Sequence, residues 1–215
     1  MKYNPNETNR VPLYDLAIWK NGLAFRDIQF SKDGKPIIKI AELKNGITDQ
    51  TKFTQDEFDD TVALHTGDMV FSWSGNPETS IDVFIYDMPD GWLNQHIFKI
   101  TPVGVDKRFL YYLLKFHKST FTAIASNKQT TGLGHVTIKD LKEFIIDIPP
   151  LNVQKNIAAI LSLFDDKITL NNKINHHLPP DISETRSSPD IRRGRRVSRR
   201  AARRADSILF ASTAA

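Results

Sequence analysis

The sequence predicts an α+β protein: a compact domain of short strands and a few helices, then one long coiled-coil-forming helix, then a disordered basic tail. Three observations support this prediction. Short apolar runs separated by turn signals occupy residues 11–150. Apolar residues spaced by three and four positions mark residues 151–178 as a helix. From residue 179 onward the chain is polar and rich in arginine, which is typical of a segment without a core.

The first elements are expected to be short. Residues 1–10 are polar and are expected to form a flexible N-terminus. The mixed apolar segment Val11–Trp19 predicts a strand or a short helix. Asp33-Gly34 is typical of a hairpin turn, and Pro36–Leu43 follows as a predicted strand with alternating faces.

The middle of the chain continues with strands and then changes to helical spacing. Three apolar runs predict strands over Gly67–Ser74, Ser80–Tyr86 and Trp92–Thr101. From Asp106 onward the apolar residues share one face of a helix, and the Asp106 carboxylate is placed to cap its first turn. A polar glycine loop, Asn127–His135, follows this helix.

The end of the domain is marked by two short elements and a break. Thr137 is placed to cap a short helix, and Phe144–Ile148 predicts a strand. Pro149 and Pro150 stop this strand, because proline fixes φ and has no amide donor for a sheet.

The longest element predicted is one helix, Asn152–Leu178. Its 27 residues would extend about 40 Å, and Asn152 is predicted to cap its N-terminus. Residues spaced by four and three positions form what we call the a/d seam: Ile157, Leu161, Phe164, Ile168, Asn171, Asn175 and Leu178. This seam predicts a coiled coil in which two buried asparagines select the register and the number of partners. The alternative is an amphipathic helix that lies on its own domain.

The charges separate the body of the chain from its tail. The whole chain carries a formal net charge of +4. Residues 179–215 hold nine arginines and four acidic residues, which leaves residues 1–178 with 20 basic and 21 acidic residues. The tail is interpreted as a disordered or accidental segment, from a changed reading frame or an appended sequence. The alternative is a segment that binds nucleic acid through phosphate charge.

The sequence contains no convincing catalytic site, so we expect no catalytic residues, no metal and no cofactor. Phosphate-loop, nucleophile-elbow and zinc-protease motifs do not occur. The acidic residues Asp56–Asp60 lack the spacing of a calcium loop, and the histidines lack zinc-ligand spacing. There is no cysteine and no run of about 18 apolar residues, so the chain is expected to be cytoplasmic and not to enter a membrane.

Polar loops that contain amides and aromatic residues are the remaining candidates for a binding site. Asparagine and glutamine can pair with adenine, and lysine with guanine, in the major groove of DNA. The DNA-binding candidates are Ser72, Trp73, Ser74, Asn76, Asn94, Gln95, His96, Lys128, Gln129, Thr130, Thr131 and His135. By composition alone these are ordinary loop residues, and that interpretation remains open.

An ordered set of motifs resembles the DNA-specificity subunit of type I restriction–modification enzymes. The motifs include the runs GLAF, GKPIIKIAEL, GDMVFSWSG and WLNQHIFKI, and the resemblance is strongest over Thr131–Asn175. In that stretch a glycine loop, a short helix, two prolines, QKNIAAIL, DDKI and NNKIN follow one another in the order of the family. The resemblance covers about residues 11–178.

The resemblance implies a target recognition domain over residues 11–150 and a spacer and dimerisation helix over residues 151–178, with no catalysis by the chain itself. The implied partners are double-stranded DNA, the methylation subunit, the restriction (motor-nuclease) subunit, and a second copy or second specificity half that packs along the long helix. Family members usually carry two recognition domains, so this chain resembles a half-subunit. Its dimer would read a bipartite target.

Two alternatives remain open. A truncated or frameshifted specificity fragment would fold but would not assemble into an active complex, because the arginine tail replaces the usual continuation of the family beyond His177. A stand-alone hydrolase or nuclease would instead show magnesium-dependent cleavage by the purified chain.

Overall fold

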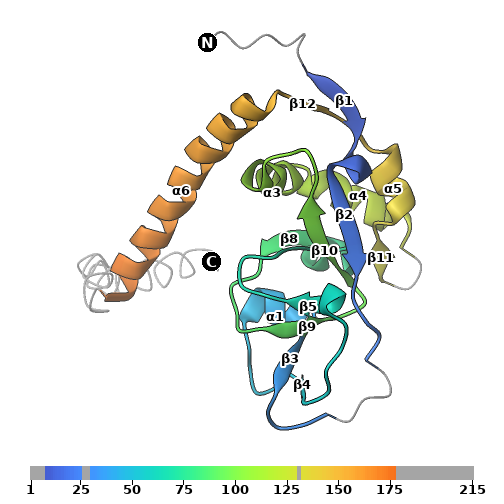
Figure 1. Cartoon of the computed structure of the whole chain (residues 1–215), viewed down its shortest axis with the longest axis vertical. Helices are drawn as coiled ribbons and strands as arrows, with labels where there is room; N and C mark the ends of the chain where they lie inside the picture. Colours follow the sequence, from blue (N-terminus) through green and yellow to red (C-terminus); the bar gives the residue numbers. More distant parts are fainter. Residues whose placement is uncertain (1–7, 26–29, 130–131, 178–215) are drawn as a thin grey trace, which may run out of the picture. The chain divides into compact units, whose positions relative to one another are not determined.

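The computed structural model describes residues 8–25, 30–129 and 132–177, in which helices and strands are mixed (Figure 1). The predicted α+β class is therefore confirmed. The chain divides into two compact units, residues 1–166 and 167–215. Every described strand lies in the first unit, which we call the body. The tail that was predicted to be disordered lies outside the described residues.

Two four-stranded sheets lie at the centre of the body. The larger sheet is antiparallel and has the order β2 (Ala17–Asn21), β10 (Ile97–Pro102), β6 (Met69–Ser72), β8 (Asp82–Ile85). The smaller sheet has the order β4 (Phe53–Thr54), β3 (Lys35–Ile38), β9 (Gly91–Leu93), β5 (Ala63–Leu64), and only its β3–β9 pair is parallel. Two short ladders pair β1 (Asn9–Pro12) with β12 (Ile145–Ile148) and β7 (Ser74–Gly75) with β11 (Gly134–His135).

Helices complete the described elements. The α-helices are α1 (Ile40–Asn45), α2 (Pro77–Ser80), α3 (Lys107–Phe116), α4 (Lys118–Asn127), α5 (Ile138–Glu143) and α6 (Leu151–His177). The 3-10 helices are η2 (Leu13–Leu16) and η3 (Asp60–Val62). Within the body, α3, α4 and α5 gather at one end, and α1 lies beside the smaller sheet (Figure 1). The segment Val11–Trp19, predicted as a strand or a short helix, contains both.

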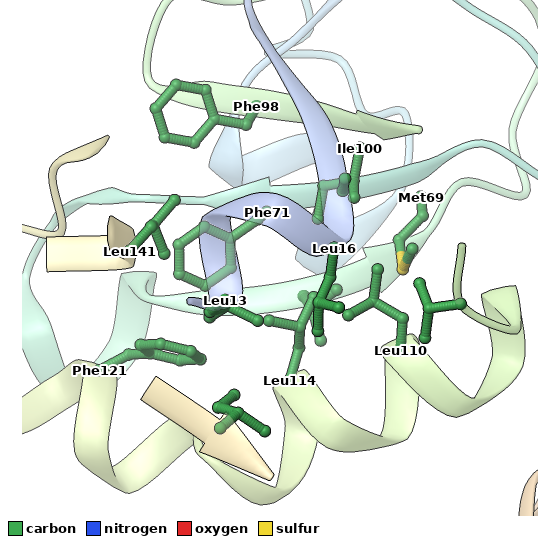
Figure 2. Packing of buried hydrophobic residues seen from close by; sticks show 14 of the residues in the cluster. Leu13, Leu16, Met69, Phe71, Phe98, Ile100, Leu110, Leu114, Phe121 and Leu141 are labelled. Carbon is green, nitrogen blue, oxygen red and sulfur yellow. The ribbon is translucent and has the colours of Figure 1, made fainter. Parts of the chain in front are cut away.

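The larger sheet is buried on both faces, because alternate residues of its strands point to different cores. On β6, Met69 and Phe71 belong to the main core, whereas Val70 belongs to a second core that also contains residues of the smaller sheet. Figure 2 shows main-core side chains packed between the sheet and the helices, among them Leu110, Leu114 and Phe121. The sheet therefore provides a rigid support for the loops at its edges.

Of three predicted N-terminal helix caps, those of α3 and α5 are confirmed and that of α6 is wrong. The Asp106 carboxylate accepts a hydrogen bond from Phe109 N at 2.9 Å, which confirms the cap of α3. Thr137 and Asp140 form a reciprocal capping box at the start of α5, as the sequence predicted for Thr137. The predicted cap Asn152 is wrong, because α6 begins at Leu151 directly after the prolines and Asn152 lies inside its first turn.

The predicted strand Pro36–Leu43 is wrong over its second half. Strand β3 ends at Ile38, and α1 begins at Ile40. The physical reason is the buried Glu42 carboxylate, which accepts hydrogen bonds from Lys39 N at 3.0 Å and from Thr51 Oγ1 at 3.1 Å. The bond from Lys39 N closes one helical turn, so the chain cannot continue as a strand here.

Two further predictions about strands are corrected by the pairing. The turn at Asp33-Gly34 does not close a hairpin, because Lys35 after it pairs with Thr54 and Ser31 before it bridges Phe53, both on β4. The predicted strand Trp92–Thr101 is divided into β9 and β10. The turn between them is closed by a hydrogen bond from Ile97 N to Asn94 O at 3.1 Å.

Candidate functional site

The DNA-binding candidates come from three segments of the sequence, and the fold brings parts of all three together. Trp73 N donates a hydrogen bond to His96 O at 3.2 Å, which joins the first segment to the second. Val136 N donates one to Trp73 O at 2.8 Å, and Ser74 pairs with His135 across the β7–β11 ladder. Residues far apart in the sequence thus become neighbours where β6 ends and β10 begins, at one end of the strands of the larger sheet.

Trp73 is held in one orientation within this group. Its ring stacks on Phe98, with 5.5 Å between the ring centroids and an interplanar angle of 24°. Its Nε1 donates a hydrogen bond to Asn21 Oδ1 at 3.0 Å, and the centroids of Trp73 and His96 lie 5.9 Å apart. Asn21, at the end of β2, was not among the candidates, because an Asn-Gly pair in a sequence is read as a turn signal.

Ser72 and Asn94 lie beneath this group, and both are buried. The Ser72 hydroxyl donates a hydrogen bond to the carbonyl oxygen of Ser80. Asn94 Oδ1 accepts a hydrogen bond from His96 N at 3.3 Å. The Ser72 bond ties β6 to the end of α2, whereas the Asn94 bond shapes the turn that carries Gln95 and His96.

Asn76 and Lys128 each have a polar group committed to the fold. Asn76 Oδ1 caps α2 by accepting hydrogen bonds from Glu78 N at 3.1 Å and Thr79 N at 3.2 Å. Lys128 Nζ lies 2.5 Å from Asp140 Oδ1. Burial raises the pKa of Asp140, but hydrogen bonds from Lys128 and from the helix cap outweigh this effect and lower the pKa. Asp140 is therefore ionised at neutral pH and offsets the charge of Lys128.

The accessible residues of the group form a candidate site that we call the polar loop surface: Asn21, Trp73, Ser74, Gln95, His96 and His135. On this surface Gln95 Nε2 and His96 Nε2 lie 3.2 Å apart. Its amide, imidazole, hydroxyl and indole groups can donate and accept hydrogen bonds, and none of the six members is acidic. Gln129 is also exposed, whereas Thr130 and Thr131 lie outside the described residues.

The first turns of α6 are attached to the body, and the a/d seam becomes exposed after them. Ile157 packs against the main core, and the neighbouring Ala158 is buried in it. The other described members of the seam are exposed: Leu161, Phe164, Ile168, Asn171 and Asn175. Leu178 lies outside the described residues. Within the first unit, α6 therefore packs on the core through its first turns, whereas Leu161 and Phe164 are exposed.

A second apolar stripe on α6 was not identified from the sequence. We call the exposed residues Ile160, Leu163, Leu170 and Ile174 the second stripe, and Leu163 is the most exposed of them at 67%. A helix turns by about 100° per residue, so the centre of the second stripe lies about 100° around the helix from that of the a/d seam. The signal was present in the same spacing of three and four positions, but Lys167 interrupts it.

The described ranges offer neither a metal site nor a membrane span. No group of three or more histidine, aspartate or glutamate side chains there could hold a metal ion. None of the described helices combines the length and the apolar content that crossing a bilayer requires.

Comparison with known proteins gives a consistent set of relatives. The family model of the type I restriction modification DNA specificity domain matches residues 5–179. The chain is 27% identical over 156 residues to the type I restriction enzyme EcoBI specificity subunit of Escherichia coli, covering 71% of this chain and 31% of that protein. It is 30% identical over 143 residues to the MjaVIII specificity subunit of Methanocaldococcus jannaschii, covering 65% and 31%. The chain thus spans about a third of the length of these two relatives.

Solved structures of such subunits share the fold. The S subunit of a type I restriction–modification system from M. genitalium superposes with a TM-score of 0.56 at 20% identity, covering 79% of this chain and 42% of that chain. The HsdS subunit from Thermoanaerobacter tengcongensis superposes with a TM-score of 0.57 at 16% identity, covering 80% and 41%.

Proposed function

This chain belongs to the type I restriction–modification DNA specificity family, and from this premise we propose that it is the DNA-sequence-recognition half of a specificity subunit. In this proposal residues 11–150 are a target recognition domain, and residues 151–178 are a spacer and dimerisation helix. The observation that carries the proposal is the convergence of Trp73, His96 and His135 on the polar loop surface.

The polar loop surface is proposed to read base edges. Asparagine and glutamine present a donor beside an acceptor, which matches adenine in the major groove, and imidazole can act as either. Trp73 is held by Phe98 and Asn21 before DNA arrives, so little side-chain freedom is lost on binding. Ser72 and Asn94 are proposed to support the surface from beneath. The residues proposed to flank it are Asn76, Lys128, Gln129, Thr130 and Thr131.

Helix α6 is proposed to join the chain to its protein partners through two surfaces. Each large apolar side chain left in water forgoes roughly 1.5–3 kcal/mol of burial energy, so the a/d seam and the second stripe both favour a partner. The a/d seam is proposed to pack against a second copy or a second specificity half. The second stripe is proposed to bind the methylation subunit. Lys167 interrupts that stripe, so two copies pairing along it would bring like charges together.

The assembly defines the target that would be read. A two-fold dimer presents two copies of the polar loop surface, so its target has two half-sites related by symmetry. The chain itself is proposed to be non-catalytic, with the methylation and restriction subunits performing the chemistry in the cytoplasm.

Footprinting tests this proposal. The full chain is mixed with its methylation subunit, and a target selected from a random duplex library is probed for protection from cleavage. We expect two protected half-sites separated by an unprotected spacer. A single short protected site would contradict the dimer, and an absence of any selected sequence would contradict DNA recognition.

The alternative is a truncated or frameshifted fragment that folds without assembling. Size-exclusion chromatography with light scattering separates the two possibilities. A dimer that binds the methylation subunit supports the proposed function, whereas a monomer that fails to bind it supports the fragment.

A further inference from the structure

Gln154 ties the start of α6 to the start of α3. Its side chain is buried, with 2% of the residue exposed. Gln154 Oε1 accepts a hydrogen bond from Asp106 N at 2.9 Å, and its Nε2 donates one to Pro149 O at 2.8 Å. Asp106 is the cap residue of α3. One buried amide therefore connects the beginnings of both helices and the residues that precede α6.

A second contact joins the same two helices further along α6. Tyr112 OH on α3 donates a hydrogen bond to Asp165 Oδ2 on α6 at 2.7 Å. Burial raises the pKa of Tyr112, and the hydrogen bond to Asp165 and the charge of that carboxylate raise it further. The phenol therefore stays protonated and remains a donor through the neutral and mildly alkaline range.

The contact at Asp165 is not backed by close packing. A cavity of about 410 Å³ lies between α3 and α6 beside this hydrogen bond, and its lining includes Tyr111, Tyr112, Ser162 and Asp165. The pocket is large enough to hold water, so the side chains of the two helices do not pack directly on each other across it, and dispersion between the helices contributes little there. Beyond the packed residues Ile157 and Ala158, the angle between α3 and α6 therefore depends on the hydrogen bond.

We propose that Gln154 and the Tyr112–Asp165 pair are positioning residues that hold the first four turns of α6 at one angle on α3, and thereby set the separation of the two half-sites. This inference rests on the proposed function. Two attachment points are needed, because a helix held only at its root can still swing. Gln154 and Asp165 lie eleven positions apart in the sequence, or about 16 Å along the helix axis.

The length of α6 makes this angle important. A swing of about 10° at the root would displace the far end of a helix about 40 Å long by about 7 Å. Successive base pairs are about 3.4 Å apart, so this displacement corresponds to about two base pairs of spacer. The loss of one hydrogen bond is thus expected to relax spacer selection without removing a single base contact.

Spin labels on the full chain test the angle without DNA. The chain has no native cysteine, so Lys139→Cys on α5 and Lys173→Cys on α6 introduce two labelling sites cleanly. Labelled chain is diluted with unlabelled chain, so that distances within one molecule dominate. Lys173 lies about 33 Å along the helix from Leu151, so we expect Tyr112→Phe and Asp165→Ala to broaden the label–label distance distribution by about 6 Å.

Two matched variants serve as controls. Asp165→Asn keeps an oxygen that accepts the Tyr112 hydrogen bond, so its distribution is expected to remain narrow. Tyr111→Phe removes the hydroxyl of the neighbouring tyrosine. The Tyr111 ring contacts Tyr112 and Lys115, but its hydroxyl makes no hydrogen bond to the described residues. Its distribution is also expected to match that of the parent. A role in stability alone would change unfolding but leave the distribution in the folded protein unchanged.

Selection from a random duplex library, with the methylation subunit present, tests the consequence for DNA. The parent is expected to select one spacer length, and Tyr112→Phe is expected to tolerate about two base pairs more or fewer with the same half-sites. Unchanged label distances in Tyr112→Phe and Asp165→Ala overturn the inference even if the parent selects two half-sites. Broadened distances support the role in holding the angle even if neither the parent nor any variant selects DNA. The failure to select DNA would overturn the proposed function instead. Broadened distances with an unchanged spacer preference overturn the link to half-site separation.

Discussion

At the scale of single residues, Asp82 links strand β8 to two helices. Its carboxylate lies 2.9 Å from Lys115 Nζ on α3 and 2.7 Å from Lys118 Nζ on α4. Burial raises the pKa of Asp82, but hydrogen bonds from Lys118 and Lys115 outweigh this and lower the pKa below its usual value. The ionised carboxylate is therefore stabilised in the folded protein relative to the unfolded chain.

Replacing Asp82 should reduce stability in a pH-dependent way. We expect Asp82→Asn to lower the free energy of unfolding at pH 7 by about 1–3 kcal/mol, because hydrogen bonds between charged groups are lost. A lowered pKa stabilises the folded state above the unfolded pKa of about 3.9, and that stabilisation disappears as pH falls through the folded value. Urea unfolding between pH 7 and pH 3 should therefore show the parent and the variant converging. Asp87→Asn, which changes an exposed carboxylate, is the matched control, and a difference that stayed constant with pH would contradict the account.

The DNA-binding candidates should separate into two groups by burial. Gln95→Ala is expected to weaken specific DNA binding by roughly 1–3 kcal/mol, the range for a good side-chain–base pair, and to leave the melting temperature unchanged. Ser72→Ala should instead lower stability by about 1 kcal/mol, because a buried hydrogen bond is lost. Fluorescence anisotropy with the selected target, together with thermal unfolding, checks both. A loss of stability in Gln95→Ala would show that its amide supports the fold.

At the scale of elements, α6 carries two exposed apolar surfaces on different faces. The a/d seam contains Phe164, which is 60% exposed, and the second stripe contains Leu163. Neighbouring residues in the sequence thus point to different sides of one helix. A two-stranded coiled coil needs only one apolar stripe on each helix. The second stripe therefore allows α6 to contact a second partner at the same time.

Charged substitutions on the two surfaces should therefore have different effects. We expect Phe164→Glu to disrupt the dimer and Leu163→Glu to weaken binding of the methylation subunit, since each change buries a carboxylate in an apolar contact. Both side chains are exposed in the chain itself, so the melting temperature of the monomer should change little. Light scattering measures the first effect, and calorimetric titration with the methylation subunit measures the second. Thr169→Glu, away from both surfaces, is the control. Equal effects of the first two changes on both partners would contradict the division.

At the scale of the whole molecule, the charge is unevenly divided between residues 1–178 and the tail, residues 179–215. Residues 1–178 carry 20 basic and 21 acidic residues, and several lysines are paired with acids. Affinity for DNA that depends on phosphate charge is therefore expected to come from the tail or from other subunits. Sequence selection is expected to come from the body.

The salt dependence of DNA binding tests this division. A chain that ends at Leu178 should bind its selected target with only a weak dependence on salt. Each phosphate contact contributes about −0.9 to the slope of log affinity against log salt. Residues 1–178 hold 20 basic and 21 acidic residues, so they offer no net positive charge for such contacts. Adding the methylation subunit should make the slope steeper. A steep slope for the shortened chain alone would show that the body makes many phosphate contacts itself.

The sequence by itself determined the elements that are bounded by local chemistry. Asp106 and Thr137 cap their helices as predicted, because a cap requires only the next few backbone amides. Pro149 and Pro150 separate β12 from α6, because proline acts on its own and its preceding residue. The 27-residue length of α6 was predicted for a similar reason, since helical spacing repeats within each turn.

Only the tertiary structure decided which residues share a surface and which are buried. Ile40–Asn45 forms a helix because the Glu42 carboxylate is buried and hydrogen-bonded. Ser72 and Asn94 lie beneath the loops, and Asn21 joins the polar loop surface through its bond to Trp73. The tertiary structure also showed that Gln154 faces inward while the second stripe faces water. These outcomes depend on contacts between residues that are distant in the chain, and neither local spacing nor composition contains that information.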